Sequence, residues 1–292
     1  MSDLTSSTVE DPAFWHSVCP ELGVERGSDG APYVIDDLDR LVDVIRFEGY
    51  VNVPDVVPGA DVARLRSCID RLHEQKIPVV FAFVYDELWL AFQRLSPFLT
   101  AVLGPGYRAL PAFWAWRLEV SGSDRGWEPH RDCAEESVDR DNSPYAMTVW
   151  LALSDATPTN GCIYVVPAHL DERFRRRVWE GDEEFAVRDL HNVRAVPATA
   201  GSMLAWNQHL LHWGGRVSRH EREPRRSVAF EFQRGDKAPF QAPLIDTSPA
   251  VPFTTRLGLV AKQLLQYRHM HPLTDEMAEI AVGLRRRYMP EA

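Results

Sequence analysis

The fold is indicated most clearly by residues 201–215, which read GSMLAWNQHLLHWGG. The run from Ser202 to Trp206 has the length and apolar composition of a buried strand. His212 follows near the end of the segment and directly precedes Gly214-Gly215, a sequence typical of a turn. The segment therefore predicts a strand entering a turn, with a histidine where the chain reverses.

Short apolar or alternating runs of the same kind recur over residues 109–235, separated by turn signals. Runs of this length at such intervals indicate an all-β sandwich or barrel. Asn160-Gly161 lies between two of them and predicts a hairpin from Thr148 to Pro167, because this dipeptide suits the tight turns of hairpins. The expected strands cover Phe113 to Val120, Ala146 to Leu153, Ile163 to Val166, Val193 to Val196, Ser202 to Trp206 and Ser227 to Phe232.

Helical periodicity flanks the β region on both sides. Apolar residues from Leu38 to Ile45 fall on one face and predict a helix, after which Tyr50 to Val53 is predicted as a short strand. A stripe from Met277 to Tyr288 predicts another helix, with Thr274 as its N-cap. We expect one domain over residues 1–292, with a helical N-terminal part (1–108), a β core (109–235) and a helical C-terminal part (236–292).

Composition narrows the class of protein. The chain has 292 residues, of which 45% are hydrophobic and 25% charged, as is typical of a globular protein. A net charge of −10 argues against nucleic-acid binding, which needs a basic face. No apolar run is long enough to span a membrane, and the stretch Met1 to Thr8 lacks the features of a signal peptide, so we expect a cytoplasmic protein. The four cysteines form no close pair and are expected to be free thiols.

His130-Arg131-Asp132 is a candidate pair of metal ligands. On a strand, side chains two residues apart point the same way, so the imidazole and the carboxylate can share one cation. Two histidines and one carboxylate on one face of an octahedral ion leave positions open for a cosubstrate and O₂, as iron(II) oxygenases require. The pattern alone is not specific, because His169-Leu170-Asp171 repeats it. The sequence around each pair has to show which of the two binds a metal.

The order of motifs resembles the phytanoyl-CoA dioxygenase (PhyH-like) family of Fe(II)/2-oxoglutarate-dependent oxygenases. That family shows an H-x-D, a strand–NG–strand element ending in a V-P-x-x-H-like turn, a strand that carries a histidine, and a P-R-x-S-like strand. The corresponding segments here are His130 to Asp132, Thr148 to His169, Gly201 to His212 and Pro224 to Ser227, and the start Phe47 to Pro54 is also similar. The resemblance spans roughly residues 38–235 and implies a double-stranded β-helix (jelly-roll or cupin-like) core.

The resemblance also implies the roles of individual residues. It assigns His130, Asp132 and His212 to the metal and to catalysis, and makes the His169-x-Asp171 pair a feature of a turn. His209 competes with His212 for the third ligand position, and counting from Gly201 favours His212. His209 is then a neighbouring or surface histidine.

The cosubstrate is expected near Arg225. An arginine can hold the distal carboxylate of 2-oxoglutarate through two hydrogen bonds, and Ser227 alternates onto the same strand face. Arg226 is expected to face the opposite side and to be solvated or ion-paired. Thr148 and Trp150 are further candidates for cofactor binding, against the alternative of plain sheet packing. Candidates for substrate or cosubstrate contacts are Trp114, Trp116, Arg117, Trp127, Glu128 and Trp206.

The implied activity is that of a non-haem Fe(II)/2-oxoglutarate-dependent dioxygenase that uses O₂. We expect hydroxylation of an unactivated C–H bond of a small-molecule metabolite, with succinate and CO₂ as co-products. The carboxylate of Asp132 argues against halogenation, for which related enzymes have a small residue. Desaturation, cyclisation or epoxidation, or a non-catalytic cupin-like binding protein, are the alternatives. Residues 133–145 and the N-terminal helical part are expected to shape the substrate pocket. No oligomeric state is predicted.

Overall fold

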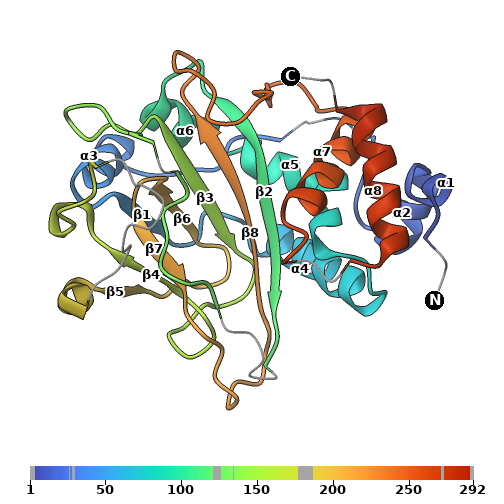
Figure 1. Ribbon diagram of the computed structural model, residues 1–292, viewed down its shortest axis with the longest axis horizontal. Helices are drawn as coiled ribbons and strands as arrows, with labels where there is room; N and C mark the ends of the chain where they lie inside the picture. The colour runs from blue at the N-terminus through green and yellow to red at the C-terminus, as the bar shows by residue number, and fades with distance from the viewer. Residues whose placement is uncertain are drawn as a thin grey trace.

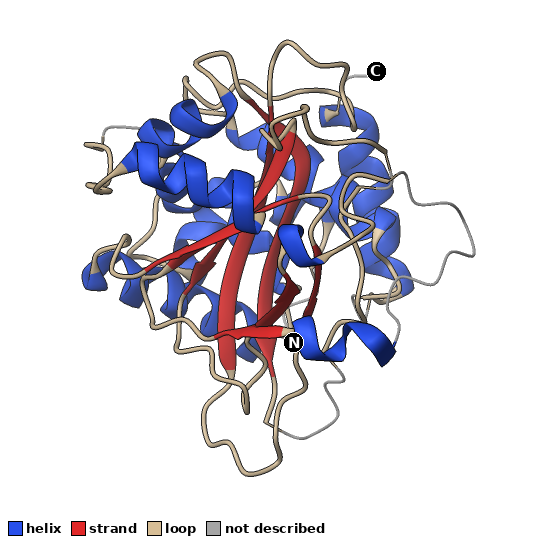
Figure 2. Ribbon diagram, turned by 90° about the vertical axis from the view of Figure 1, so that its left-hand side faces the viewer, coloured by secondary structure: helices blue, strands red, loops and turns tan. Residues whose placement is uncertain are grey.

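Two antiparallel β-sheets occupy the centre of the protein (Figures 1 and 2). They are seen in a computed structural model that describes residues 4–25, 27, 30–120, 126–133, 135–176, 187–270 and 273–289. The larger sheet has the strand order β1-β6-β3-β8-β2 and the smaller has the order β5-β4-β7. The strands are β1 (Tyr50–Val53), β2 (Arg108–Leu118), β3 (Ala146–Ala152), β4 (Ile163–Val166), β5 (Arg194–Val196), β6 (Met203–Asn207), β7 (Leu211–Gly214) and β8 (Arg225–Gln233).

Helices surround the sheets, and several of them cover the outer face of the larger one, at the right of Figure 1. They are α1 (Ser6–Val9), α2 (Pro12–Val18), α3 (Leu38–Glu48), α4 (Gly59–Glu74), α5 (Asp86–Gln93), α6 (Ser96–Leu103), α7 (Phe253–Gln266) and α8 (Asp275–Tyr288), with 3-10 helices at Val79–Val84, Ala168–Leu170 and Val187–Asn192. Thr274 caps α8 as predicted, because its side chain accepts a hydrogen bond from the Met277 amide. No helix in the described ranges is long and apolar enough to cross a bilayer. Met1 to Asp3 of the N-terminal stretch lie outside the described residues.

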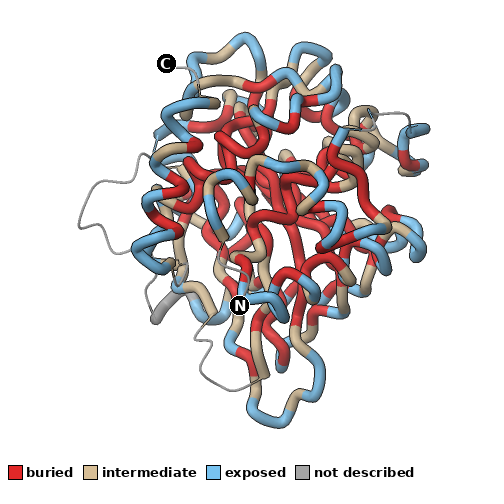
Figure 3. Tube along the Cα trace, turned by 90° about the vertical axis from the view of Figure 1, so that its right-hand side faces the viewer, coloured by how far each residue is buried: buried red, intermediate tan, exposed pale blue. Residues whose placement is uncertain are grey.

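Alternation along the central strands separates two environments. On β8, Val228, Phe230 and Phe232 point toward the helices and join the large hydrophobic core. Aromatic rings from the helical side meet them there, as between Phe92 and Phe230, whose centroids are 5.5 Å apart. The intervening side chains of β8 face the smaller sheet. Figure 3 shows this buried interior enclosed by a largely exposed outer layer.

The face turned toward the smaller sheet has its own core. Trp150, Leu204 and Ala229 of the larger sheet pack there with Ile163 and Val165 of the smaller one. Two facing antiparallel sheets with helices outside form the double-stranded β-helix architecture expected from the sequence. The space between the sheets is where a ligand can enter without disturbing the helical core.

The predicted hairpin at Asn160-Gly161 is wrong. β3 already has two neighbours, β6 and β8, whereas β4 pairs with β5 and β7 in the other sheet. The dipeptide therefore lies in a connection that passes from one sheet to the other. Asn160 stabilises this connection, since its side-chain amide donates to the Asp155 carbonyl and its side-chain oxygen accepts from the Thr157 amide. Gly161 has a φ of 87°, a conformation that favours glycine.

Contrary to the prediction, the chain also does not reverse its direction at His212. The chain turns earlier, where the Leu210 amide donates to the Asn207 carbonyl, and it then enters β7. His212 lies on that strand and pairs with Val165 of β4. A strand gives this side chain a fixed direction, which a turn of the chain would not.

Candidate active site

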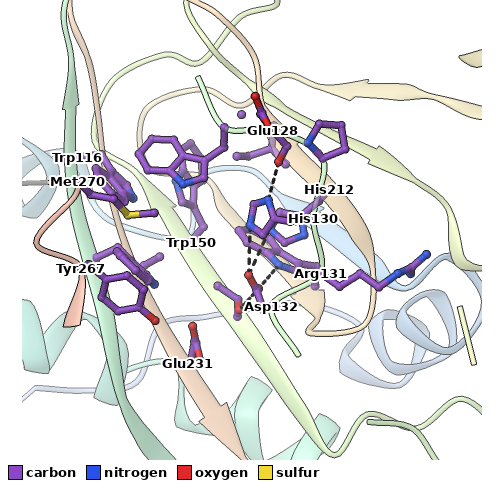
Figure 4. Close-up of a pocket in the computed structure, with 18 of the residues that line it drawn as sticks. Trp116, Glu128, His130, Arg131, Asp132, Trp150, His212, Glu231, Tyr267 and Met270 are labelled. Carbon is purple, nitrogen blue, oxygen red and sulfur yellow. Dashed lines mark hydrogen bonds and ion pairs between the residues drawn. The ribbon is translucent and has the colours of Figure 1, made fainter. Parts of the chain in front are cut away.

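A cavity of about 480 Å³ lies against the inner face of the larger sheet. Strand residues form its walls and the segment after α7 adds one side (Figure 4). The lining comprises Trp114, Trp116, Trp127, Glu128, Pro129, His130, Arg131, Asp132, Thr148, Trp150, Ile163, Trp206, His212, Gly214, Arg225, Ala229, Glu231, Gln241, Tyr267 and Met270.

Backbone pairing brings His130 and His212 together although 82 positions separate them in the sequence. The two residues form an isolated antiparallel bridge, in which each amide donates to the other's carbonyl at 3.0 Å. Their rings lie 4.4 Å apart between centroids. Asp132 follows His130 by two residues, so the same pairing delivers the carboxylate to the same place.

The three side chains converge on one point. The Nε2 atoms of His130 and of His212 each lie 3.6 Å from Oδ1 of Asp132. One ligand atom from each residue lies within 4.8 Å of the other two, and no other such group of His, Cys, Asp or Glu occurs in the described part of the chain. Figure 4 shows the three side chains directed at one another. The spacing is compatible with a single first-row metal ion, whose bonds to such atoms are near 2 Å.

Hydrogen bonds on the far side of each group fix its orientation. Nδ1 of His130 lies 2.7 Å from the Glu128 carbonyl, and Nδ1 of His212 lies 3.0 Å from the Leu210 carbonyl. A carbonyl accepts only, so Nδ1 carries the proton in both rings and the Nε2 lone pair faces the shared point. This is the arrangement in which a neutral imidazole binds a metal.

Asp132 is held in the same manner. Its Oδ2 accepts a hydrogen bond from the Thr148 hydroxyl at 2.7 Å and another from the Trp206 indole N–H at 2.9 Å. Both donors come from neighbouring strands of the larger sheet, β3 and β6. Oδ1 remains directed at the two imidazoles, so one oxygen is fixed by the protein and the other is available to a ligand.

Electrostatics favour the charge states that bind metals. Burial by itself would raise the pKa of Asp132, but the adjacent His212 and His130 lower it, and the carboxylate is ionised at neutral pH. Burial is also the main influence on His212 and lowers its pKa to about 4, although Asp132 acts in the opposite direction. A neutral imidazole and an anionic carboxylate therefore coexist at neutral pH.

The competing histidines lie elsewhere. His209 is buried rather than on the surface, and its Nε2 lies 2.6 Å from the Arg176 carbonyl. His169 stacks on Phe47 with ring centroids 4.3 Å apart, while Asp171 pairs with Arg131 at 2.8 Å. The second His-x-Asp sequence thus belongs to a turn and does not form a site.

Arg225 and Ser227 lie on the inner face of β8. Nη1 of Arg225 donates to the Gly161 carbonyl at 2.7 Å, and its guanidinium carbon lies 5.5 Å from the centre of the Trp150 ring. The Ser227 hydroxyl is buried and has no hydrogen-bond partner in the described part of the chain. Arg226 points the other way and pairs with Asp70 at 2.7 Å, as expected from strand alternation.

The substrate side of the cavity differs from expectation. Of the aromatic and charged candidates, only Arg117 is absent from the lining; it pairs with Asp70 at 3.0 Å. The expectation that residues 133–145 and the N-terminal helical part shape the pocket is wrong, because the described lining lies between Trp114 and Met270 and includes none of those residues. The C-terminal part takes this role, since α7 ends at Gln266 and the following turn covers the cavity.

Sequence reasoning missed Glu231, Gln241, Tyr267 and Met270. Glu231 had a detectable signal, because it stands between two phenylalanines of a strand that is buried on both faces. A charged residue in such a strand needs a partner or a function. Gln241, Tyr267 and Met270 had no such signal, since their position depends on how the C-terminal segment folds back.

The chain is similar to known proteins in part of its sequence and in its fold. Residues 112–226 match the family model described as phytanoyl-CoA dioxygenase (PhyH). The fold is similar to that of the alpha ketoglutarate dependent epimerase SnoN from nogalamycin biosynthesis (22% identity, 68% of this chain and 83% of that chain, TM-score 0.53). It is also similar to EctD from S. alaskensis, solved with 2-oxoglutarate and 5-hydroxyectoine (18% identity, 73% and 83%, TM-score 0.52), and to the carbocyclase SnoK (15% identity, 75% and 100%, TM-score 0.53). No curated protein matches the chain.

The fold and the matched segment together define a class, the non-haem iron and 2-oxoglutarate-dependent oxygenases built on a double-stranded β-helix. The matched residues 112–226 run from β2 to the start of β8 and include the two histidines and the carboxylate described above. Over this segment the chain is similar to the phytanoyl-CoA dioxygenase (PhyH) family. The solved structures, all below 25% identity, support the fold and leave the substrate open.

Proposed function

We propose that the protein hydroxylates an unactivated C–H bond of a small-molecule metabolite, with His130, Asp132 and His212 as the iron ligands. The observation that carries this proposal is the convergence of two Nε2 atoms on one carboxylate oxygen, each at 3.6 Å. Two imidazoles and one carboxylate are the ligand set of non-haem iron(II) oxygenases and leave coordination positions open. Bound iron(II) supplies the oxidising chemistry that couples conversion of 2-oxoglutarate and O₂ to succinate and CO₂ with oxidation of the substrate.

The protein's own groups prepare the metal site. Thr148 and Trp206 fix Asp132, so it keeps its direction when the site is filled. The carbonyls of Glu128 and Leu210 do the same for the two imidazoles. Thr148, first considered as a cosubstrate contact, is therefore proposed as a positioning residue for the metal ligand.

We assign the distal carboxylate of 2-oxoglutarate to Arg225 and Ser227. A carboxylate at this end of the cavity would meet the buried guanidinium of Arg225, which lines the cavity. Ser227 is not among the described lining residues, but its buried hydroxyl, on the same strand face, has no hydrogen-bond partner in the described part of the chain. The Trp150 ring lies beside the guanidinium and the Gly161 carbonyl holds one of its nitrogens, so the arginine is fixed before the cosubstrate binds. Preorganisation of this kind lowers the entropic cost of binding.

The aromatic walls limit access of water to the reacting region. Trp114 and Trp116 from β2 and Trp206 from β6 line the same cavity. Its lining extends from β2 to the turn after α7, which supports a single oxygenase domain built by the β core and the C-terminal part together. The volume of about 480 Å³ suits a small molecule beside the cosubstrate.

The experiment that tests this function measures succinate in the presence of Fe(II), 2-oxoglutarate and O₂, with and without candidate metabolites. A substrate should raise succinate formation, and its product should gain one oxygen atom in mass. Loss of two hydrogen atoms would instead identify desaturation or cyclisation. An unchanged product mass with substrate-dependent succinate would contradict hydroxylation, and no succinate under any condition would contradict the oxygenase assignment.

A further inference from the structure

The cavity contains a carboxylate that the iron and cosubstrate assignments leave unused. Glu231 lies on the inner face of β8 and opposite Thr148 of β3. Its side chain is buried and lines the cavity, and Oε2 accepts a hydrogen bond from the Gln208 amide at 2.7 Å. Arg225 is six residues earlier on the same face, roughly 20 Å away along a strand. The guanidinium and the carboxyl therefore lie at opposite ends of one wall.

Aromatic rings surround this end of the cavity. The nearby cation, Lys262, is buried behind the lining and donates a hydrogen bond to the side-chain oxygen of Gln241 at 3.0 Å. Tyr267 packs edge-on against Trp114 with ring centroids 4.2 Å apart, and Trp114 stacks with Trp116 at 5.5 Å. In Figure 4 the Tyr267 hydroxyl is directed toward the Glu231 carboxylate, and Trp116 and Met270 are drawn on the same side of the cavity as Tyr267. Aromatic faces attract cations, as do carboxylates.

The groups of the described lining that remain after these assignments include two carboxyls. Glu128 and Glu231 are the acidic lining residues not assigned to the metal. Among the basic residues of the described lining, Arg225 is assigned to the cosubstrate and Arg131 directs its guanidinium to Asp171, away from the cavity in Figure 4. The described part of the lining thus offers a substrate acceptors and aromatic surfaces.

We propose that the substrate carries a basic nitrogen, and that Glu231 binds this protonated amine while the rings of Trp114, Trp116 and Tyr267 enclose it. The inference rests on the proposed function and names the substrate class of the same site. A buried carboxylate selects strongly for a group that can donate to it, because an unmatched ligand leaves it without compensation. Burial, followed by the nearby Asp132 carboxylate, raises the pKa of Glu231 to about 8, and a bound cation would reverse this effect.

The test uses the enzyme loaded with Fe(II) and 2-oxoglutarate under anaerobic conditions. The probes are phenethylamine, 2-phenylethanol and phenylacetate, which share one ring and differ in the charge of the side chain. Binding is followed by the fluorescence of the cavity tryptophans. We expect the amine to bind about tenfold more tightly than the alcohol, or better, and the carboxylate to bind least well. Equal affinity for amine and alcohol, or no binding of the amine up to its solubility limit, would overturn the proposal.

Variants then assign the preference to one residue. Glu231→Gln should retain the visible absorption of the iron–2-oxoglutarate complex and lose the preference for the amine, whereas Glu279→Gln, on the exposed side of α8, should keep both. Loss of the preference in Glu128→Gln but not in Glu231→Gln would contradict the assignment. If Glu231→Gln does not fold, Glu231→Asp, which keeps the charge, must retain the preference. Absence of the iron–2-oxoglutarate band in the wild type would instead refute the proposed function, so the two failures are distinguishable.

Discussion

The hydroxyl of Thr148 donates a 2.7 Å hydrogen bond to Oδ2 of Asp132, and this bond joins the central strand β3 to the proposed metal site. The other carboxylate oxygen is left facing the imidazoles of His130 and His212. A sheet residue thus determines which oxygen of the ligand is available. The affinity of the site for iron should therefore depend on this hydrogen bond.

Replacement of Thr148 by valine should weaken Fe(II) binding by about 10–100-fold, since groups that orient metal ligands typically have effects of this size. Valine keeps the shape and removes only the donor. Thr148→Ser restores the hydroxyl and should restore most of the affinity. Anaerobic Fe(II) titration measures both variants, and equal affinities for valine and serine would show that the hydrogen bond has no role.

Replacing His209 or His212 by alanine should have different effects on iron binding and on stability. His212→Ala is expected to abolish Fe(II) binding because it deletes a ligand. His209→Ala should bind iron normally but lose about 1–3 kcal/mol of unfolding free energy, since it removes a fully buried imidazole and its hydrogen bond to the Arg176 carbonyl. Metal titration and urea unfolding distinguish the two, and iron loss in the His209 variant with retention in the His212 variant would reverse the assignment.

Arg225 and Arg226 form a matched pair of neighbours on opposite faces of β8. Arg225→Gln should raise the dissociation constant for 2-oxoglutarate by about 10–100-fold, as expected for loss of charge-assisted hydrogen bonds. Arg226→Gln should leave it unchanged, because that side chain pairs with Asp70 outside the cavity. Equilibrium binding of 2-oxoglutarate to the iron-loaded variants provides the measurement. Similar losses of affinity for 2-oxoglutarate in both variants would contradict the assignment of Arg225, because they would indicate a general effect on the strand.

The stability of the metal-free protein should depend on pH through Glu231. The folded state raises the pKa of this carboxyl from 4.5 to about 8, so between these values the folded chain holds a proton that the unfolded chain has lost. Stability from this group is present below pH 4.5 and is lost as the pH rises toward 8. Glu231→Gln should therefore gain stability relative to the wild type between pH 5 and pH 8. Urea unfolding at pH 5 and pH 8 tests this prediction. A difference in unfolding free energy between the variant and the wild type that is the same at both pH values would contradict it.

Local patterns predicted every strand except β7, and they brought together one half of the candidate site. β4 has the predicted bounds, because an apolar run between turn residues has few alternatives, and His130 and Asp132 share a face as their spacing implies. The partner strand of β4 and the position of His212 could not be obtained in this way. They depend on which strand edges are already occupied, and this is decided by the whole sheet.

Long-range packing also explains what was missed at the substrate end. Tyr267 and Met270 reach the cavity because α7 packs along the core and ends beside β2, a contact that no short pattern encodes. Glu231 was recognisable in principle as a charged residue in a fully buried strand. That Glu231 lines the cavity could be learned only from the structure.

The most direct test of the proposed site is an anaerobic titration of Fe(II) into the protein with 2-oxoglutarate, followed by the visible charge-transfer absorption of the complex. The wild type should show the band with an end point at one iron per chain, and Asp132→Ala should form it only with a clearly weakened affinity for iron. A wild type without the band, or an Asp132→Ala variant that forms it with unchanged affinity, would contradict the assignment of His130, Asp132 and His212 as the iron ligands.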